Sequence, residues 1–136
     1  VALLRAVRDA ASGATVVAAG YADARRVPHA PLAPELVVRV ARAAGVGACM
    51  LDTAIKDGRG LLEWLTPDAL GALVSEAHAA GLEIALAGAL RAEDLSVIRD
   101  TGADIVGVRS AVCAGGQRAG RLDPARVRAL TRLPAT

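Results

Sequence analysis

The sequence predicts an α/β fold in which four parallel strands alternate with helices. Apolar runs of strand length follow a glycine that ends a helix at residues 15–22, 48–51, 83–87 and 104–108. The composition is 54% hydrophobic but only 1% aromatic, which suits parallel strands built from Val, Leu, Ile and Ala. Strict alternation of strands and helices implies a parallel sheet with right-handed crossovers.

The first twelve residues predict a leading helix, which Gly13 closes before the strand at 15–22. This helix has no N-cap and no initiator methionine, so we expect the chain to be cut from a longer one. The loop after the first strand is bounded by prolines and carries His29, for which we expect a structural or exposed role.

Each later helix has its own start signal. Pro34 begins the helix before the second strand, and Thr66-Pro67 supplies an N-cap with proline in the first turn. Residues 90–99 have their apolar side chains at helical spacing, and Asp123-Pro124 starts the last helix. His78 lies within one of these helices, where a structural or exposed role is again expected.

The 136 residues make up a single domain, with a leading helix at 1–12 and four βα units at 14–136. Four such units are half of a (β/α)8 barrel, and an open four-stranded sheet is the alternative. No G-x-G-x-x-G turn follows a strand, which argues against a dinucleotide-binding open sheet. Polar or glycine-rich segments follow every strand, whereas an open sheet would gather them at a single switch point in the strand order. We therefore predict a half-barrel of the TIM-barrel class.

Several partner classes are excluded by composition. The net charge is +2 with arginines scattered among acidic residues, and aromatic side chains are nearly absent, so nucleic acid is not expected as a partner. No apolar run is long enough to span a membrane. Cys49 and Cys113 adjoin apolar runs without CxxC spacing, which predicts buried thiols in a reduced, cytoplasmic protein. We expect no disulfide, no metal and no cofactor.

The segment after the second strand carries the only lysine in the chain, Lys56. A lysine, unlike an arginine, can lose its proton when desolvated and then attack a carbonyl. Asp52 lies four residues earlier, about 13 Å away on an extended strand, so the two meet only if the chain turns near Thr53. Asp52 would then hold the ammonium or move a proton, while Lys56 binds phosphate or acts as acid or base. Asp23 is the third catalytic candidate. The alternative is a solvated lysine in a surface turn.

A glycine-rich loop after the fourth strand predicts a phosphate site. Barrel enzymes often hold phosphate with backbone N–H groups of the last strand loops. Glycines let the backbone approach an anion, and arginines supply charge. The alternative is a flexible loop with two surface arginines. The predicted phosphate-binding residues are Gly88, Gly107, Arg109, Gly115, Gly116 and Arg118.

Together, these segments resemble the (5-formylfuran-3-yl)methyl phosphate synthase family of methanofuran biosynthesis. The resemblance rests on Tyr21-Ala-Asp23, the block from Leu51 to Gly58, Ala85 to Gly88, and Gly107 to Arg118. It implies a carbon–oxygen lyase on a (β/α)8 barrel, which condenses two molecules of glyceraldehyde 3-phosphate through a Schiff base, without a metal, losing phosphate and water. Asp52 and Lys56 map onto active-site positions of that family.

The same resemblance places the Schiff-base lysine and a second catalytic lysine in the amino-terminal half of the barrel. We therefore expect this chain to be the carboxyl-terminal half, inactive without its amino-terminal partner, with Lys56 in a supporting role. Ala89 and Ser110 stand where the family is expected to have Ser and Gly. Two alternatives stay open: another Schiff-base phosphosugar aldolase or synthase, and a non-catalytic phosphate-binding half-barrel. A homo-oligomer is also left open.

Overall fold

The computed structural model describes residues 1–28 and 32–132, so His29 lies outside the described residues. The described chain forms one sheet in which neighbouring strands are parallel and follow one another in sequence order. The predicted α/β class and parallel sheet are therefore confirmed. The strands are β1 (Val17–Tyr21), β2 (Ala48–Asp52), β3 (Glu83–Leu86) and β4 (Ile105–Val106).

An α-helix precedes the sheet and one follows each strand. Short 3-10 turns at Pro34–Leu36 and Ala92–Asp94 lead into the second and fourth helices, where continuous helix was expected. The two predicted N-caps are present: Thr66 Oγ1 accepts from Ala69 N at 3.3 Å, and Asp123 Oδ1 accepts from Ala125 N at 2.8 Å. The helices are α1 (Ala2–Ala10), α2 (Val37–Ala44), α3 (Pro67–Ala79), α4 (Leu95–Asp100) and α5 (Pro124–Thr131).

The helix–glycine–strand junctions form as predicted. Gly45, which ends α2, has a φ of 68° and donates its N–H to the carbonyl of Arg42 at 3.0 Å. A residue with a Cβ is strained at positive φ, so glycine is the residue that turns the chain here at least cost. Gly81 and Gly102 come one residue later, after the C-cap residues Ala80 and Thr101 of α3 and α4, and also have positive φ, 71° and 80°.

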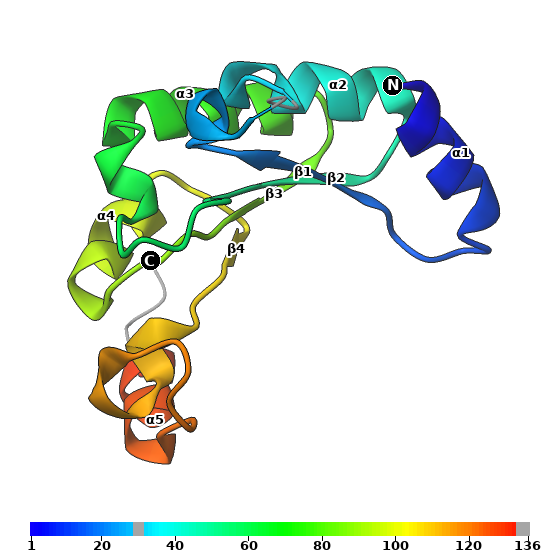
Figure 1. Cartoon of the computed structure of the whole chain (residues 1–136). Coiled ribbons are helices and arrows are strands. Elements are labelled where there is room, and N and C mark those ends of the chain that lie inside the picture. The colour runs from blue at the N-terminus through cyan, green and yellow to red at the C-terminus, as the bar shows by residue number, and fades with distance from the viewer. Residues whose placement is uncertain (29–31, 133–136) are drawn as a thin grey trace.

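The core lies between the helices and one face of the sheet. Alternate strand residues, among them Leu51, Ile84 and Leu86, are fully buried there. The opposite face carries the row Ala19, Met50, Ala85 and Ile105, whose members pair across the sheet. Figure 1 shows α2, α3 and α4 on one side of the sheet, with α1 beyond the β1 end and α5 below β4; within the described residues no helix covers the other side. A sequential strand order with right-handed crossovers places all helices on one side.

Both cysteines are buried, as predicted, and neither is in a disulfide. Burial, followed by the charges of Asp104 and Glu76, raises the pKa of the Cys49 thiol to about 11. Such a thiol stays protonated at neutral pH and is a poor nucleophile. Of the helices that the structure describes, none is long and apolar enough to cross a membrane.

Candidate anion site at the carboxyl edge of the sheet

A cavity of about 240 Å3 opens where β2, β3 and β4 end. Three loops line it, each following one of these strands, and they come together because parallel strands end at the same edge of the sheet. Four of the eight lining residues are cations. The lining residues are Lys56 and Gly58 after β2, Ala89 and Arg91 after β3, and Arg109, Ser110, Gly116 and Arg118 after β4.

Three of the four cations have no carboxylate neighbour in the part of the chain that the structure describes. Among the residues that the structure describes, no acidic oxygen lies within 4.0 Å of the guanidinium of Arg91, Arg109 or Arg118. Positive charge gathered without a counter-ion favours an anionic ligand, and the planar guanidinium matches the paired oxygens of phosphate. The cavity is therefore suited to a phosphate or phosphate ester.

Asp52 and Lys56 meet at the rim of this cavity. The strand ends at Asp52, the chain turns, and Lys56 Nζ lies 3.1 Å from Asp52 Oδ1. The ammonium also donates to the carbonyl of Thr53, while Asp52 Oδ1 accepts from Thr53 N at 2.7 Å. The Lys56 side chain is 35% exposed, so a ligand can reach it. The turn thus brings together the two residues predicted to act as a pair.

Asp23 is placed differently. Its side chain is buried, and its two oxygens accept from Ala54 N and Ile55 N, each at 2.8 Å. It lies at the wall of a separate cavity beside Trp64, away from the cluster of arginines. The structure therefore does not place this predicted catalytic residue in the anion cavity.

Of the predicted glycines, only Gly116 lines the cavity. Gly107 lies where the backbone passes close to β3, since a Cβ there would come within 2.9 Å of Ala87 Cβ. Gly88 accepts from Leu61 N at 2.9 Å through its carbonyl. These two glycines shape the strand ends rather than contact the cavity. Gly115, although next to Gly116, is also outside the lining.

Arg91 is the lining cation that sequence reasoning missed. It follows Gly88 in the loop after β3, just as Arg109 follows Gly107 in the loop after β4. The signal that could have found it is an arginine shortly after a strand-ending glycine, the pattern that predicted Arg109 after the last strand. Arg91 adds a fourth cation to the lining of the cavity.

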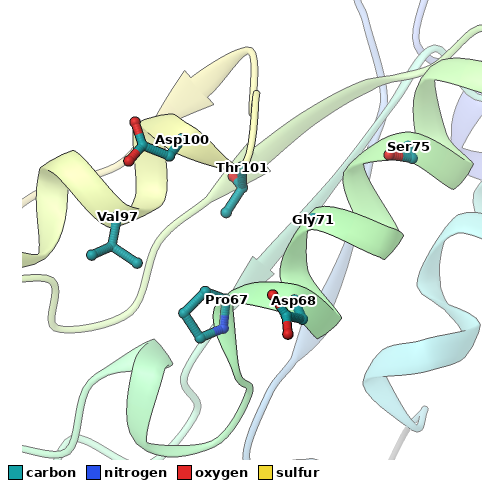
Figure 2. Close-up of a pocket in the computed structure, with 7 residues that line it drawn as sticks. All are labelled: Pro67, Asp68, Gly71, Ser75, Val97, Asp100 and Thr101. Carbon is teal, nitrogen blue, oxygen red and sulfur yellow. The ribbon is translucent and has the colours of Figure 1, made fainter.

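A larger cavity, of about 540 Å3, lies between α3 and α4 on the helix layer (Figure 2). It contains none of the predicted site residues. Its charged members are both carboxylates, Asp68 and Asp100, so its electrostatic character is opposite to that of the anion cavity. The residues that line it are Pro67, Asp68, Gly71, Ser75, Val97, Asp100 and Thr101.

His78 takes part in a contact between α3 and the start of β4. Its Nε2 lies 3.0 Å from Asp104 Oδ2, which also accepts from Ile84 N at 2.8 Å. These hydrogen bonds, the one from Ile84 first, lower the pKa of Asp104. The histidine side chain is 45% exposed, in line with the structural or exposed role predicted for it. No group of three or more His, Cys, Asp or Glu residues in the described chain is arranged to hold a metal ion.

Comparison with known proteins identifies the family. The sequence model of the family described as 4-HFC-P synthase matches residues 1–131. The (5-formylfuran-3-yl)methyl phosphate synthase of Methanocaldococcus jannaschii is 46% identical over 132 residues, 96% of this chain and 55% of that protein. The proteins of the same name from Methanopyrus kandleri and Methanococcus maripaludis strain S2 are 52% identical over 114 residues and 43% identical over 130.

These two alignments cover 84% and 95% of this chain, but 47% and 54% of the relatives. The chain thus spans about half the length of the curated relatives it matches. The match extends over all the strands and over every loop that lines the anion cavity. The chain belongs to the 4-HFC-P synthase family.

Proposed function

We propose that this chain is the carboxyl-terminal half of a (β/α)8 barrel. Two observations support the proposal. The strands follow in sequence order, and the helices α2, α3 and α4 that pack on them lie on one side, which is the arrangement of a barrel wall. A doubly wound sheet reverses its strand order and has helices on both faces. The matched relatives are also about twice as long as the aligned segment, which leaves room for four more βα units.

The whole enzyme, on this proposal, is a lyase that condenses two molecules of glyceraldehyde 3-phosphate to (5-formylfuran-3-yl)methyl phosphate in methanofuran biosynthesis. The observation that carries it is the cavity at the carboxyl edge, where Lys56, Arg91, Arg109 and Arg118 surround a space of about 240 Å3. Substrate and product both carry a phosphate, and this cavity has the charge to hold one. The names of the matched relatives give the product, (5-formylfuran-3-yl)methyl phosphate.

The cavity residues have two tasks in this reaction. The arginines hold a substrate phosphate and stabilise the negative charge that grows on a departing phosphate. Lys56 donates a hydrogen bond or a proton at the same rim, and Asp52 holds its ammonium in place at 3.1 Å. The Schiff-base lysine comes from the amino-terminal half, so Lys56 supports the chemistry without forming the covalent bond.

The test is an assay of glyceraldehyde 3-phosphate consumption and furan formation by this chain joined to its proposed amino-terminal half. We expect Lys56→Ala to lower kcat/KM by about 100-fold, the lower range for a general acid or base. Arg39→Ala is the matched control, because Arg39 is an exposed cation on α2 that does not line the cavity, and its guanidinium lies 4.0 Å from the Glu76 carboxylate. We expect that variant to keep its activity within about twofold.

A second measurement addresses the phosphate site directly. Calorimetry with inorganic phosphate should show binding to the chain, weakened about tenfold by Arg109→Ala or Arg118→Ala and unchanged by Arg39→Ala. The proposal would be wrong if the complete enzyme made no furan product and the arginine variants bound phosphate as tightly as the unmodified chain. Phosphate binding without turnover would leave the non-catalytic half-barrel as the better description.

A further inference from the structure

The loop that carries Lys56 has no regular secondary structure. It leaves β2 at Asp52 and runs without a helix or strand to the short turn at Leu61–Glu63. The backbone N–H and C=O groups of such a segment are not paired in a helix or sheet, so its conformation depends on the side chains that bind them. The position of the lysine therefore depends on contacts made by the residues just before and after it.

Asp23 makes the contacts on the near side. Ala22 N donates to the carbonyl of Asp52 at 2.8 Å, which extends the β1–β2 pairing and places Asp23 beside the loop. The Asp23 carboxylate then accepts from two consecutive amides, Ala54 N and Ile55 N. The side chain is only 1% exposed, and a buried carboxylate is stable only where hydrogen bonds replace its water.

We propose that Asp23 is a positioning residue that fixes Lys56 at the rim of the anion cavity by holding the backbone of Ala54 and Ile55. Lys56 is the next residue after Ile55, and its ammonium folds back onto Asp52 and Thr53. Asp23 does not line the cavity, so it acts through the loop and not by touching a ligand. This assignment replaces the catalytic role expected from sequence, and it rests on the proposed role of Lys56 as a hydrogen-bond or proton donor to a ligand at the rim of the anion cavity.

A separate cluster holds the far side of the loop. Asp57 Oδ2 lies 3.2 Å from Arg26 Nη1 and 2.5 Å from Arg59 Nη2. Both guanidinium groups stack on the ring of Trp64, at 5.5 and 4.5 Å from its centroid. Because this cluster does not involve Asp23, the loop stays attached at one end when Asp23 is changed. Loss of the Asp23 contacts should therefore free Lys56 without unfolding the sheet.

The uniqueness of Lys56 provides the test, because a chain labelled with 13C-lysine gives one set of lysine signals in NMR. In the unmodified chain without ligand, the two ε-methylene protons should be inequivalent, since the ammonium is held by Asp52 and Thr53. In Asp23→Asn, one side-chain oxygen becomes an amide donor that cannot accept from its backbone N–H. We expect the ε-methylene signals to merge and the Kd for inorganic phosphate to rise about tenfold.

Asp104→Asn is the matched control. Asp104 also accepts a backbone N–H at 2.8 Å, but it does so at the amino end of β4, where it cannot hold the Lys56 loop. This variant should lose thermal stability while keeping the unmodified lysine signals and phosphate affinity. An unchanged lysine spectrum in Asp23→Asn would overturn the positioning role, even if phosphate binds. If the spectrum changes but the unmodified chain binds no phosphate, the positioning role stands and the proposed function fails.

Amide exchange in the unmodified chain keeps the inference testable should Asp23→Asn not fold. Ala54 and Ile55 lie outside any helix or strand, so protection of their amides from hydrogen exchange must come from the Asp23 carboxylate. We expect both amides to exchange at least tenfold more slowly than that of Gly58, which is exposed in the same loop. Equal exchange rates at the three amides would overturn the inference.

Discussion

Aspartates at the strand ends of this chain differ in role because their neighbours differ. Asp23 is buried and accepts from two backbone amides. Asp52 faces the ammonium of Lys56 at the cavity rim, and Asp57 joins two arginines on the outside of the same loop. Asp104 lies at the other edge of the sheet, against His78. An aspartate carboxylate in this chain thus binds backbone amides, pairs with an amine, or forms salt bridges at the surface, depending on its neighbours.

Asp104 gives the chain an acid-sensitive contribution to stability. Its folded pKa lies below the ordinary value of 3.8, chiefly because Ile84 N donates to it, so folding favours the charged form. That stabilisation is fully present above about pH 4 and is lost as the pH falls through the folded pKa. Asp104→Asn should therefore lower the free energy of unfolding at pH 7, and the difference from the unmodified chain should shrink below pH 4.

Urea unfolding between pH 2 and pH 7, about the range over which carboxylates titrate, checks this prediction. His78→Gln is the useful comparison, since it leaves the hydrogen bond from Ile84 N intact. That bond is the larger cause of the lowered pKa, so His78→Gln should lose less of the pH-dependent stability than Asp104→Asn. A difference between Asp104→Asn and the unmodified chain that stayed constant down to pH 2 would contradict the assignment.

The contact between Asp52 and Lys56 is decided by chain geometry alone. Asp52 and Lys56 were expected to meet only if the chain turned after the strand, and β2 does end at Asp52. The role of Asp23 could not be predicted, because it depends on which amides of a neighbouring loop lie within reach. Sequence spacing does not contain that information: Asp23 and Ala54 are 31 positions apart.

At the level of the elements, the junction between β3 and the loop of Arg91 depends on Gly88. This residue has a φ of 115°, and a Cβ there would lie 2.9 Å from Thr53 Cγ2 and 3.0 Å from Thr53 N. The backbones of two neighbouring loops approach closely here, and only a residue without a side chain fits. The glycine therefore sets the distance between the two loops that bring Lys56 and Arg91 to the cavity.

Gly88→Ala should lower the free energy of unfolding by about 2–4 kcal/mol, through backbone strain and overlap with Thr53. Gly71→Ala is the matched control, because Gly71 lies inside α3 with nothing within 4 Å of the added Cβ. That substitution should raise stability by about 0.5–1 kcal/mol, since alanine favours a helix interior. Urea unfolding of both variants measures the two effects. Equal urea midpoints for Gly88→Ala and Gly71→Ala would refute the explanation by strain and overlap at Gly88.

Element order and junctions were predictable because each rests on local chemistry: a proline or cap at the helix start and a glycine at its end. Strand lengths were less predictable. The last strand was expected at 104–108 but spans only Ile105–Val106. As an outermost strand among the described residues, it has a partner on one side only. Two further bonds continue the pairing, from Asp104 N to the carbonyl of Ile84 at 3.1 Å and from Gly107 N to the carbonyl of Leu86 at 2.8 Å.

The whole molecule has one covered and one uncovered sheet face. The composition, rich in Val, Leu, Ile and Ala, suited parallel strands buried on both faces, yet in the described chain Val17 is 45% exposed and Ile105 is 55% exposed. Both lie on the outermost strands, whose free edges can also pair with another chain. In the proposed barrel this face would be the interior, closed by the other half. A face of this kind is attractive to any apolar surface of similar shape.

This 136-residue chain should therefore self-associate through the uncovered face when studied without a partner half. Ile105→Lys places a charge on the edge strand β4 of that face and should weaken association about tenfold, or ~1.4 kcal/mol. Leu3→Lys is the control: it makes the same change of charge at a residue that is 77% exposed on α1, off the sheet. Sedimentation velocity over a range of concentrations separates the two variants. A chain that stayed monomeric throughout, or that responded equally to both substitutions, would show that the uncovered face is not a binding surface.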